Sequence, residues 1–194
     1  MPRLRSVSFL VLSAAIVIAG CDGAAAVSSF DPSGPCTADG RAPGAYPDLE
    51  SLVPKIYQGV APATLDSGRN CTPANLGSLT KSGIAEVRFA GGTWTFGAER
   101  AAALAVFRSK GLTADALATF YMESAAAASR TQLVAGTTPT IAGRQGRRLD
   151  TQTGERLQTV VVWPAADADT VNVVITNDLP DARIQDAIDA YGGR

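Results

Sequence analysis

The order in which strand and helix patterns follow one another constrains the fold of this 194-residue chain more than any other feature. Residues 86–89 and 93–96 alternate apolar and polar side chains as strands do, and residues 112–130 carry an apolar stripe at helical spacing. Residues 101–107 could continue as a strand, which we favour, or begin a helix. Further strand patterns follow at 132–134, 138–142, 147–151, 156–163 and 170–176, and a last helix begins near residue 179. No strand–helix–strand unit repeats, which argues against a doubly wound parallel sheet. The order predicts an α+β fold, with two helices packed on one face of an antiparallel sheet of five or six strands.

Local signals refine this prediction. The patterns at 86–89 and 93–96 flank Gly91 and Gly92, which predicts a hairpin turned at these glycines because glycine adopts positive φ without strain. Thr113 is an N-cap residue for the helix that follows it. Residues 157–163 form the most apolar strand, and we expect it at the centre of the sheet.

The first 21 residues have the organisation of an export signal. Arg3 and Arg5 precede 13 uncharged residues, 6–18, a run shorter than the roughly 20 apolar residues that span a bilayer. The run ends in Ile18-Ala19-Gly20-Cys21, which resembles the lipobox of bacterial lipoproteins. The resemblance implies that a diacylglyceryl group is added to the Cys21 thiol and that the chain is cleaved after Gly20. The alternative is an ordinary secretory signal in which Cys21 occurs by chance.

These observations divide the chain into a signal peptide at 1–20, a lipid-anchored tether at 21–46 and a single α+β domain at 47–194. The tether is rich in glycine, proline, serine and alanine and has no sustained apolar period, so we expect it to be flexible or loosely packed. Residues 48–54, followed by Gly59-Val60, resemble the opening of small, uncharacterised exported lipoproteins of actinobacterial and chloroflexal type. That resemblance implies an α+β domain and no catalytic residues.

Two cysteines remain once Cys21 carries lipid. Cys36 and Cys71 lie in irregular stretches, and an even pair of cysteines in an exported protein predicts a disulfide. The alternative is two free thiols, which an environment that does not oxidise cysteine would favour.

Arg144, Arg147 and Arg148 cluster around two glycines. Three guanidinium groups at a turn could contact a phosphate, a carboxylate or anionic lipid headgroups. The alternative is a solvated hairpin tip whose arginines pair with Asp150 and Glu155.

Seven aromatic residues fall at strand and helix spacing in the domain. They could line a cavity for an apolar ligand, or they could belong to the hydrophobic core. They are Trp94, Phe96, Phe107, Phe120, Tyr121, Trp163 and Tyr191.

Composition narrows the classes of function. The chain has no histidine, so the commonest general base and the commonest metal ligand are both absent. The net charge of −1 argues against nucleic acid as a partner. No residue set predicts a catalytic centre, a metal site or a cofactor. We therefore expect a non-enzymatic protein, held on the extracytoplasmic face of the cell membrane by lipid on Cys21, that binds a small apolar ligand or an envelope protein. The alternative is a hydrolytic enzyme that uses carboxylate, serine or tyrosine chemistry.

Overall fold

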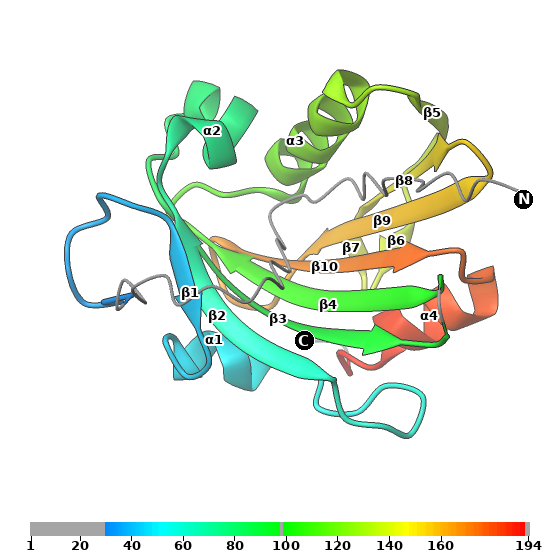
Figure 1. Cartoon of the computed structure of the whole chain (residues 1–194), viewed down its shortest axis with the longest axis horizontal. Helices are drawn as coiled ribbons and strands as arrows, with labels where there is room; N and C mark the ends of the chain where they lie inside the picture. Colours follow the sequence, from blue (N-terminus) through cyan, green and yellow to red (C-terminus); the bar gives the residue numbers. More distant parts are fainter. Residues whose placement is uncertain (1–29, 98, 193–194) are drawn as a thin grey trace, which may run out of the picture.

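The computed structural model describes residues 30–97 and 99–192, which fold around one eight-stranded antiparallel sheet (Figure 1). Its strand order is β1-β2-β3-β4-β10-β9-β8-β5. These strands are β1 (Gly40–Ala42), β2 (Thr64–Asn70), β3 (Val87–Thr95), β4 (Ala101–Arg108), β5 (Thr131–Thr137), β8 (Arg147–Thr153), β9 (Arg156–Pro164) and β10 (Thr170–Asn177). A separate two-stranded sheet pairs β6 (Thr140–Ile141) with β7 (Arg144–Gln145).

Helices cover both faces of the large sheet. One face carries α2 (Pro73–Leu76), the 3-10 helix η1 (Gly77–Ser82) and α3 (Ala114–Ala127), and the other carries α1 (Pro47–Leu52) and α4 (Asp181–Asp189). Figure 1 shows α2 and α3 above the sheet, and α1 and α4 below it. Thr113 caps α3 as predicted, since its hydroxyl accepts a hydrogen bond from the Ala116 backbone N–H at 3.1 Å.

The prediction of an α+β fold with five or six strands and both helices on one face is wrong: the protein is mostly β, with short helices on either side of eight strands. The reason lies in interior strands that are apolar on both sides, such as β9, which lies third from the β5 edge of the sheet and not at its centre as predicted. In β9, Val160 and Val162 face the α3 side, while Val161 and Trp163 face the α4 side, and all four are buried. A strand with two apolar faces needs a cover on each face.

Strands β1 and β2 were not predicted from the sequence, because they lack apolar alternation. The buried polar residues of β2, Ser67 and Arg69, form hydrogen bonds to other parts of the chain instead. Ser67 Oγ accepts from the Tyr46 backbone N–H at 2.7 Å and donates to Glu50 Oε1 at 2.8 Å. The Arg69 guanidinium donates to three backbone carbonyls of the preceding loop, those of Asp31, Gly34 and Pro35.

The hairpin turn predicted at Gly91 and Gly92 is wrong too. Both glycines lie inside β3, and the turn to β4 follows Phe96, whose backbone N–H donates to the Arg100 carbonyl at 2.8 Å. Position 92 has little space for a side chain, because a Cβ there would lie 3.0 Å from atoms of Pro62 and Trp94.

The Cys36–Cys71 disulfide predicted from the sequence is confirmed, with a Cα–Cα distance of 6.0 Å. It joins the loop before β1 to the end of β2. Together with the Arg69 contacts, it places part of the expected tether against the domain, and Tyr46 is buried in the core. The boundary expected at residue 47 therefore lies within the packed part of the chain. Cys21 lies outside the described residues.

None of the helices in the described ranges has both the length and the apolar character needed to cross a bilayer.

Candidate functional site

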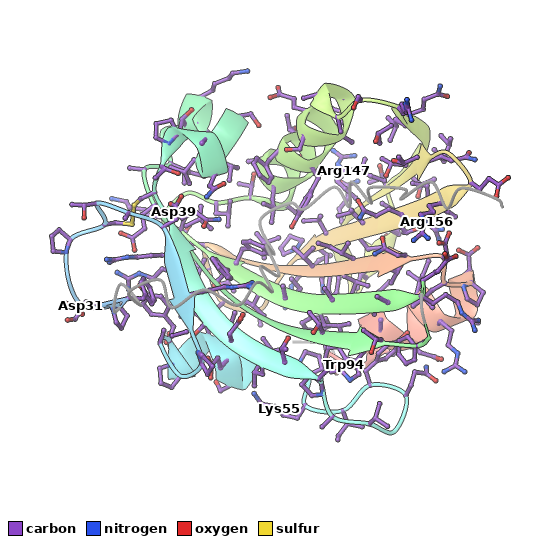
Figure 2. The ribbon with its side chains drawn as sticks, in the orientation of Figure 1. Asp31, Asp39, Lys55, Trp94, Arg147 and Arg156 are labelled. Atoms are coloured by element: carbon purple, nitrogen blue, oxygen red, sulfur yellow. A yellow bond between two sulfur atoms is a disulfide. The ribbon has the colours of Figure 1, made fainter. Side chains whose placement is uncertain are left out.

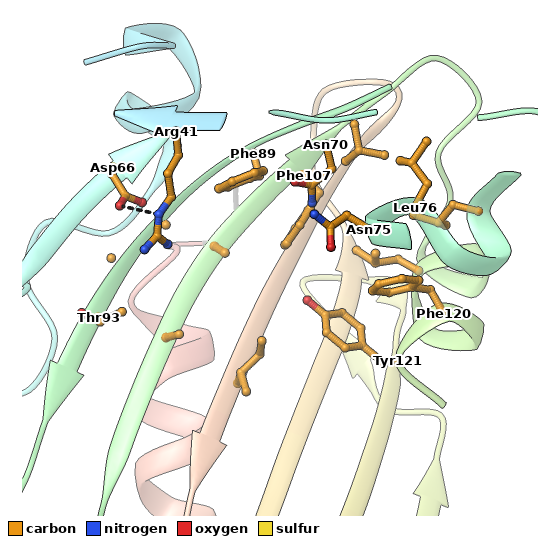
Figure 3. A pocket seen from close by; sticks show the side chains of 18 of the residues that line it. Arg41, Asp66, Asn70, Asn75, Leu76, Phe89, Thr93, Phe107, Phe120 and Tyr121 are labelled. Atoms are coloured by element: carbon orange, nitrogen blue, oxygen red, sulfur yellow. Dashed lines mark ion pairs between the residues drawn. The ribbon is translucent and has the colours of Figure 1, made fainter. Parts of the chain in front are cut away.

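An apolar pocket of about 200 Å³ opens on the α3 side of the sheet. It forms because α3 packs on β5, β8 and β9, so that among the described residues no long helix lies over β2, β3 and β4 on that face. Helix α2, η1 and one side of α3 close the pocket laterally, as Figure 3 shows. The position of a single helix on a wide sheet thus creates the site.

Small side chains make the floor of the pocket. Gly91 of β3 lies opposite Ala105 of β4, and Thr93 lies opposite Ala103. Because none of these residues has a long side chain, the sheet surface is hollow there. A Cβ on Gly91 would already lie 3.3 Å from the Cβ of Ala105, so even alanine would be a tight fit.

Aromatic rings form the walls. Phe89 and Phe107 pair across β3 and β4 with ring centroids 6.0 Å apart, and Phe120 of α3 contacts Tyr121 with centroids 5.5 Å apart. All four rings line the pocket. Such a surface favours apolar molecules, because burying apolar area is the dominant favourable term in binding.

Tyr121 adds one polar group to this apolar surface. The residue is 7% exposed, and its hydroxyl forms no hydrogen bond with the part of the chain that the structure describes. In Figure 3 the hydroxyl points away from Phe120, toward the strands of the floor. Burial raises the pKa of Tyr121 well above its ordinary value, so the phenol keeps its proton and can donate a hydrogen bond.

The charges of the pocket lining balance one another. Arg41 Nε lies 3.6 Å from Asp66 Oδ2, and among the described lining residues these two alone carry a charge. Burial raises the pKa of Asp66, and the neighbouring Arg41 opposes that effect. No group of three or more Cys, Asp or Glu side chains within the described ranges could hold a metal ion.

Asp39 positions the α2 wall of the pocket. Its carboxylate accepts hydrogen bonds from the backbone N–H groups of Cys71 and Thr72 at 2.6 and 2.9 Å, from the Thr72 hydroxyl, and from Asn75 Nδ2 at 2.6 Å. Figure 2 shows Asp39 beside the disulfide. The carboxylate and the disulfide therefore hold the start of α2 against the end of β2.

We expect Asp39→Asn to lower the stability of the protein by about 1–2 kcal/mol at pH 6, because an amide accepts these hydrogen bonds less well than a carboxylate. Burial alone would raise the pKa of Asp39, but the hydrogen bonds from Thr72, Cys71 and Asn75 outweigh it and lower the pKa below 3.8. A lowered folded-state pKa stabilises the fold above about pH 4, and this contribution is lost as the pH falls through the folded value.

Urea unfolding between pH 2 and 7 measures this effect. The difference between the parent protein and Asp39→Asn should shrink as the pH falls below 3.8, the ordinary pKa of the carboxyl, toward the lower folded-state pKa. Asp189→Asn is the control, since the Asp189 carboxylate is exposed on α4 and accepts one hydrogen bond, from Gln185. A pH-independent difference for Asp39→Asn would contradict the assignment.

The structure does not bring the three predicted arginines together. Arg147 and Arg148 are adjacent in β8 and point to opposite faces, as neighbouring strand residues do. Arg147 Nε donates to Asp115 of α3 at 2.7 Å, and its side chain is labelled in Figure 2. Arg148 pairs with Asp150 and, on the α4 side, with Asp181 at 2.7 Å. Arg144 lies on β7 in the small sheet.

The seven predicted aromatic residues divide between pocket and core. Phe107, Phe120 and Tyr121 line the pocket, whereas the other four pack on the α1 and α4 side: Trp94, Phe96, Trp163 and Tyr191. Sequence reasoning missed Phe89, Gly91 and Ala103. The alternation through 89, 91 and 93 could have found Phe89 and Gly91, because it places both on one face of a continuous strand. Ala103 lies on β4 opposite Thr93, and only the strand pairing brings it to the same face.

No known protein family has a model that matches the sequence, and no curated protein matches it. Among solved structures, PA94 from Pseudomonas aeruginosa, a protein of unknown function, is similar with a TM-score of 0.34 and 17% identity over 55% of this chain and 76% of that chain. A likeness at this level carries no argument about fold or activity.

Proposed function

We propose that this protein binds a small apolar or amphiphilic molecule in the pocket over β2, β3 and β4, while lipid on Cys21 holds it at the extracytoplasmic face of the cell membrane. The observation that carries the binding proposal is the apolar pocket on a sheet face that is otherwise covered by helices. Ligand binding that removes such an open apolar surface from water lowers the free energy of the protein.

The size of the pocket indicates the size of the ligand. An apolar cavity of roughly 150 Å³ accommodates benzene, and pockets for drug-sized molecules begin at roughly 300 Å³. A pocket of about 200 Å³ therefore suits one aromatic ring or a segment of an acyl chain. The organisation of residues 1–21 supports the anchor, because two acyl chains hold a protein to a bilayer durably where one does not.

Mass spectrometry of the intact protein, purified from its own membranes under native conditions, tests the anchor. We expect the mass of residues 21–194 with added acyl groups. A mass that includes residues 1–20 and lacks acyl groups would contradict it.

Toluene tests the pocket, because it is water-soluble at millimolar concentration, uncharged and without hydrogen-bonding groups. Titration followed by nuclear magnetic resonance should shift the signals of Phe89, Phe107 and Phe120 in a saturable way. If toluene at millimolar concentration leaves these signals unchanged, the pocket does not bind apolar molecules and the proposal fails.

A further inference from the structure

We propose that the pocket selects an uncharged amphiphile, such as a fatty alcohol or an acyl ester, over a fatty-acid anion, and that the Tyr121 hydroxyl donates a hydrogen bond to the uncharged head. This inference rests on the proposed function and names the chemical class of its ligand.

The four tyrosines of the chain provide the first argument. Three of them have a hydrogen-bonded hydroxyl: Tyr46 bonds to the Pro32 carbonyl at 3.3 Å, Tyr57 to the Arg183 carbonyl at 2.8 Å, and Tyr191 to the carbonyls of Ala105 and Val173 at 2.9 and 3.0 Å. Only the hydroxyl of Tyr121 has no hydrogen-bond partner among residues 30–97 and 99–192. Buried hydroxyl groups almost always have a partner, and the pocket is where an external partner would lie.

Tyr121 and Tyr191 differ in whether the described part of the chain bonds to their hydroxyl groups. Both are buried tyrosines that pack on the same sheet, one on the α3 side and one on the α4 side. On the α4 side, backbone carbonyls saturate the hydroxyl of Tyr191. On the pocket side, the Tyr121 hydroxyl forms no hydrogen bond with residues 30–97 or 99–192, so a ligand atom with a lone pair can take that place.

The charge balance of the lining provides the second argument. Arg41 is ion-paired with Asp66, so it does not present an uncompensated positive charge to a ligand. A carboxylate brought into this apolar pocket would lose its water without gaining a counter-charge, which is strongly unfavourable. An alcohol or ester loses less on leaving water and needs only a hydrogen-bond partner.

The polar residues around the Tyr121 hydroxyl provide the third argument. Asn70 and Asn75 line the pocket, and Figure 3 shows them on the same side of it as the hydroxyl. Asn75 Nδ2 is engaged by Asp39, which leaves its carbonyl oxygen as an acceptor. The side-chain amide of Asn70 makes no hydrogen bond to any residue in the described ranges. Uncharged donors and acceptors together match a hydroxyl or ester head.

The test compares three probes that separate shape from head group: toluene, octan-1-ol and sodium octanoate at pH 8. Calorimetric titration of the folded protein should show octan-1-ol binding at least about tenfold tighter than octanoate. Tyr121→Phe should lower the affinity for octan-1-ol about five- to tenfold and change the affinity for toluene by less than about twofold, because the substitution removes one hydrogen bond and keeps the ring.

Tyr191→Phe is the matched control. It removes the hydroxyl of the other buried tyrosine, which lies on the opposite face, and should leave the ratio of octan-1-ol to toluene affinity unchanged. Melting temperatures of both variants establish that the comparison is made on folded protein.

Each outcome bears on a separate claim. If toluene does not bind, the proposed function fails. If toluene binds but octanoate binds as tightly as octan-1-ol, selection of an uncharged head is overturned. If Tyr121→Phe lowers the affinities for toluene and octan-1-ol equally, or changes neither affinity, the hydroxyl is not the donor.

Discussion

Ala103→Trp is expected to lower the affinity of the pocket for toluene at least about 30-fold, because an indole ring placed on the floor occupies a cavity little larger than one that holds benzene. Ala103 lies on β4 opposite Thr93 and in register with Ile175 of β10. All three residues line the pocket, and Ala103 is partly exposed there. The new side chain therefore enters empty space and need not displace the packed core.

Ala101→Trp is the matched control for this substitution. Ala101 lies on the same strand, two residues earlier and on the same side of the sheet, but outside the pocket lining. Toluene titration and the melting temperature are measured on both variants. We expect the Ala101 variant to bind toluene as the parent protein does. Unchanged binding in a folded Ala103→Trp variant would place the ligand elsewhere.

The double variant Cys36→Ser, Cys71→Ser is expected to be less stable than the parent by about 3–4 kcal/mol. The disulfide links residues 35 positions apart and so lowers the conformational entropy of the unfolded chain. For a domain of this size, such a loss corresponds to a melting temperature lower by about 10 °C. Calorimetry on the oxidised parent, the reduced parent and the double variant measures it. The reduced parent should match the variant, and an unchanged melting temperature would show that the bond does not stabilise the fold.

The same variant should also weaken toluene binding. Cys71 follows β2 directly, and its backbone N–H belongs to the hydrogen bonds that Asp39 makes at the start of α2. Loss of the disulfide loosens the loop that carries Asp39, and α2 forms one wall of the pocket. Stability and binding are therefore coupled at this end of the molecule.

Much of the local structure was predictable, because short-range patterns specify it. The Thr113 cap, the apolar strand that became β9 and the Cys36–Cys71 pair each depend on residue types at fixed spacing. The strand β2 was not predictable in this way. Its buried polar residues form hydrogen bonds to partners far away in the chain, such as the loop carbonyls that bind the Arg69 guanidinium.

The pocket illustrates why the site was harder to predict than the strands. Gly91 and Gly92 form a turn signal when read alone, yet in the fold they lie inside β3, and Gly91 opens space above the sheet. Tyr121 belongs to the apolar stripe of α3, and Tyr191 lies two residues beyond the end of α4. Only their surroundings distinguish a hydroxyl held by the backbone from one left for a ligand.

Residue patterns alone predicted most of the strands, the α3 cap and the disulfide, because each depends on neighbours or on the chemistry of one residue type. Packing between distant segments decided the rest: which face each helix covers, how many strands join the sheet, and where the surface stays open. The physical reason is that a strand with two apolar faces does not specify which helix will cover each face. In the part of the chain that the structure describes, the pocket exists because α3 covers the β5, β8 and β9 part of its face and does not extend over β2, β3 and β4.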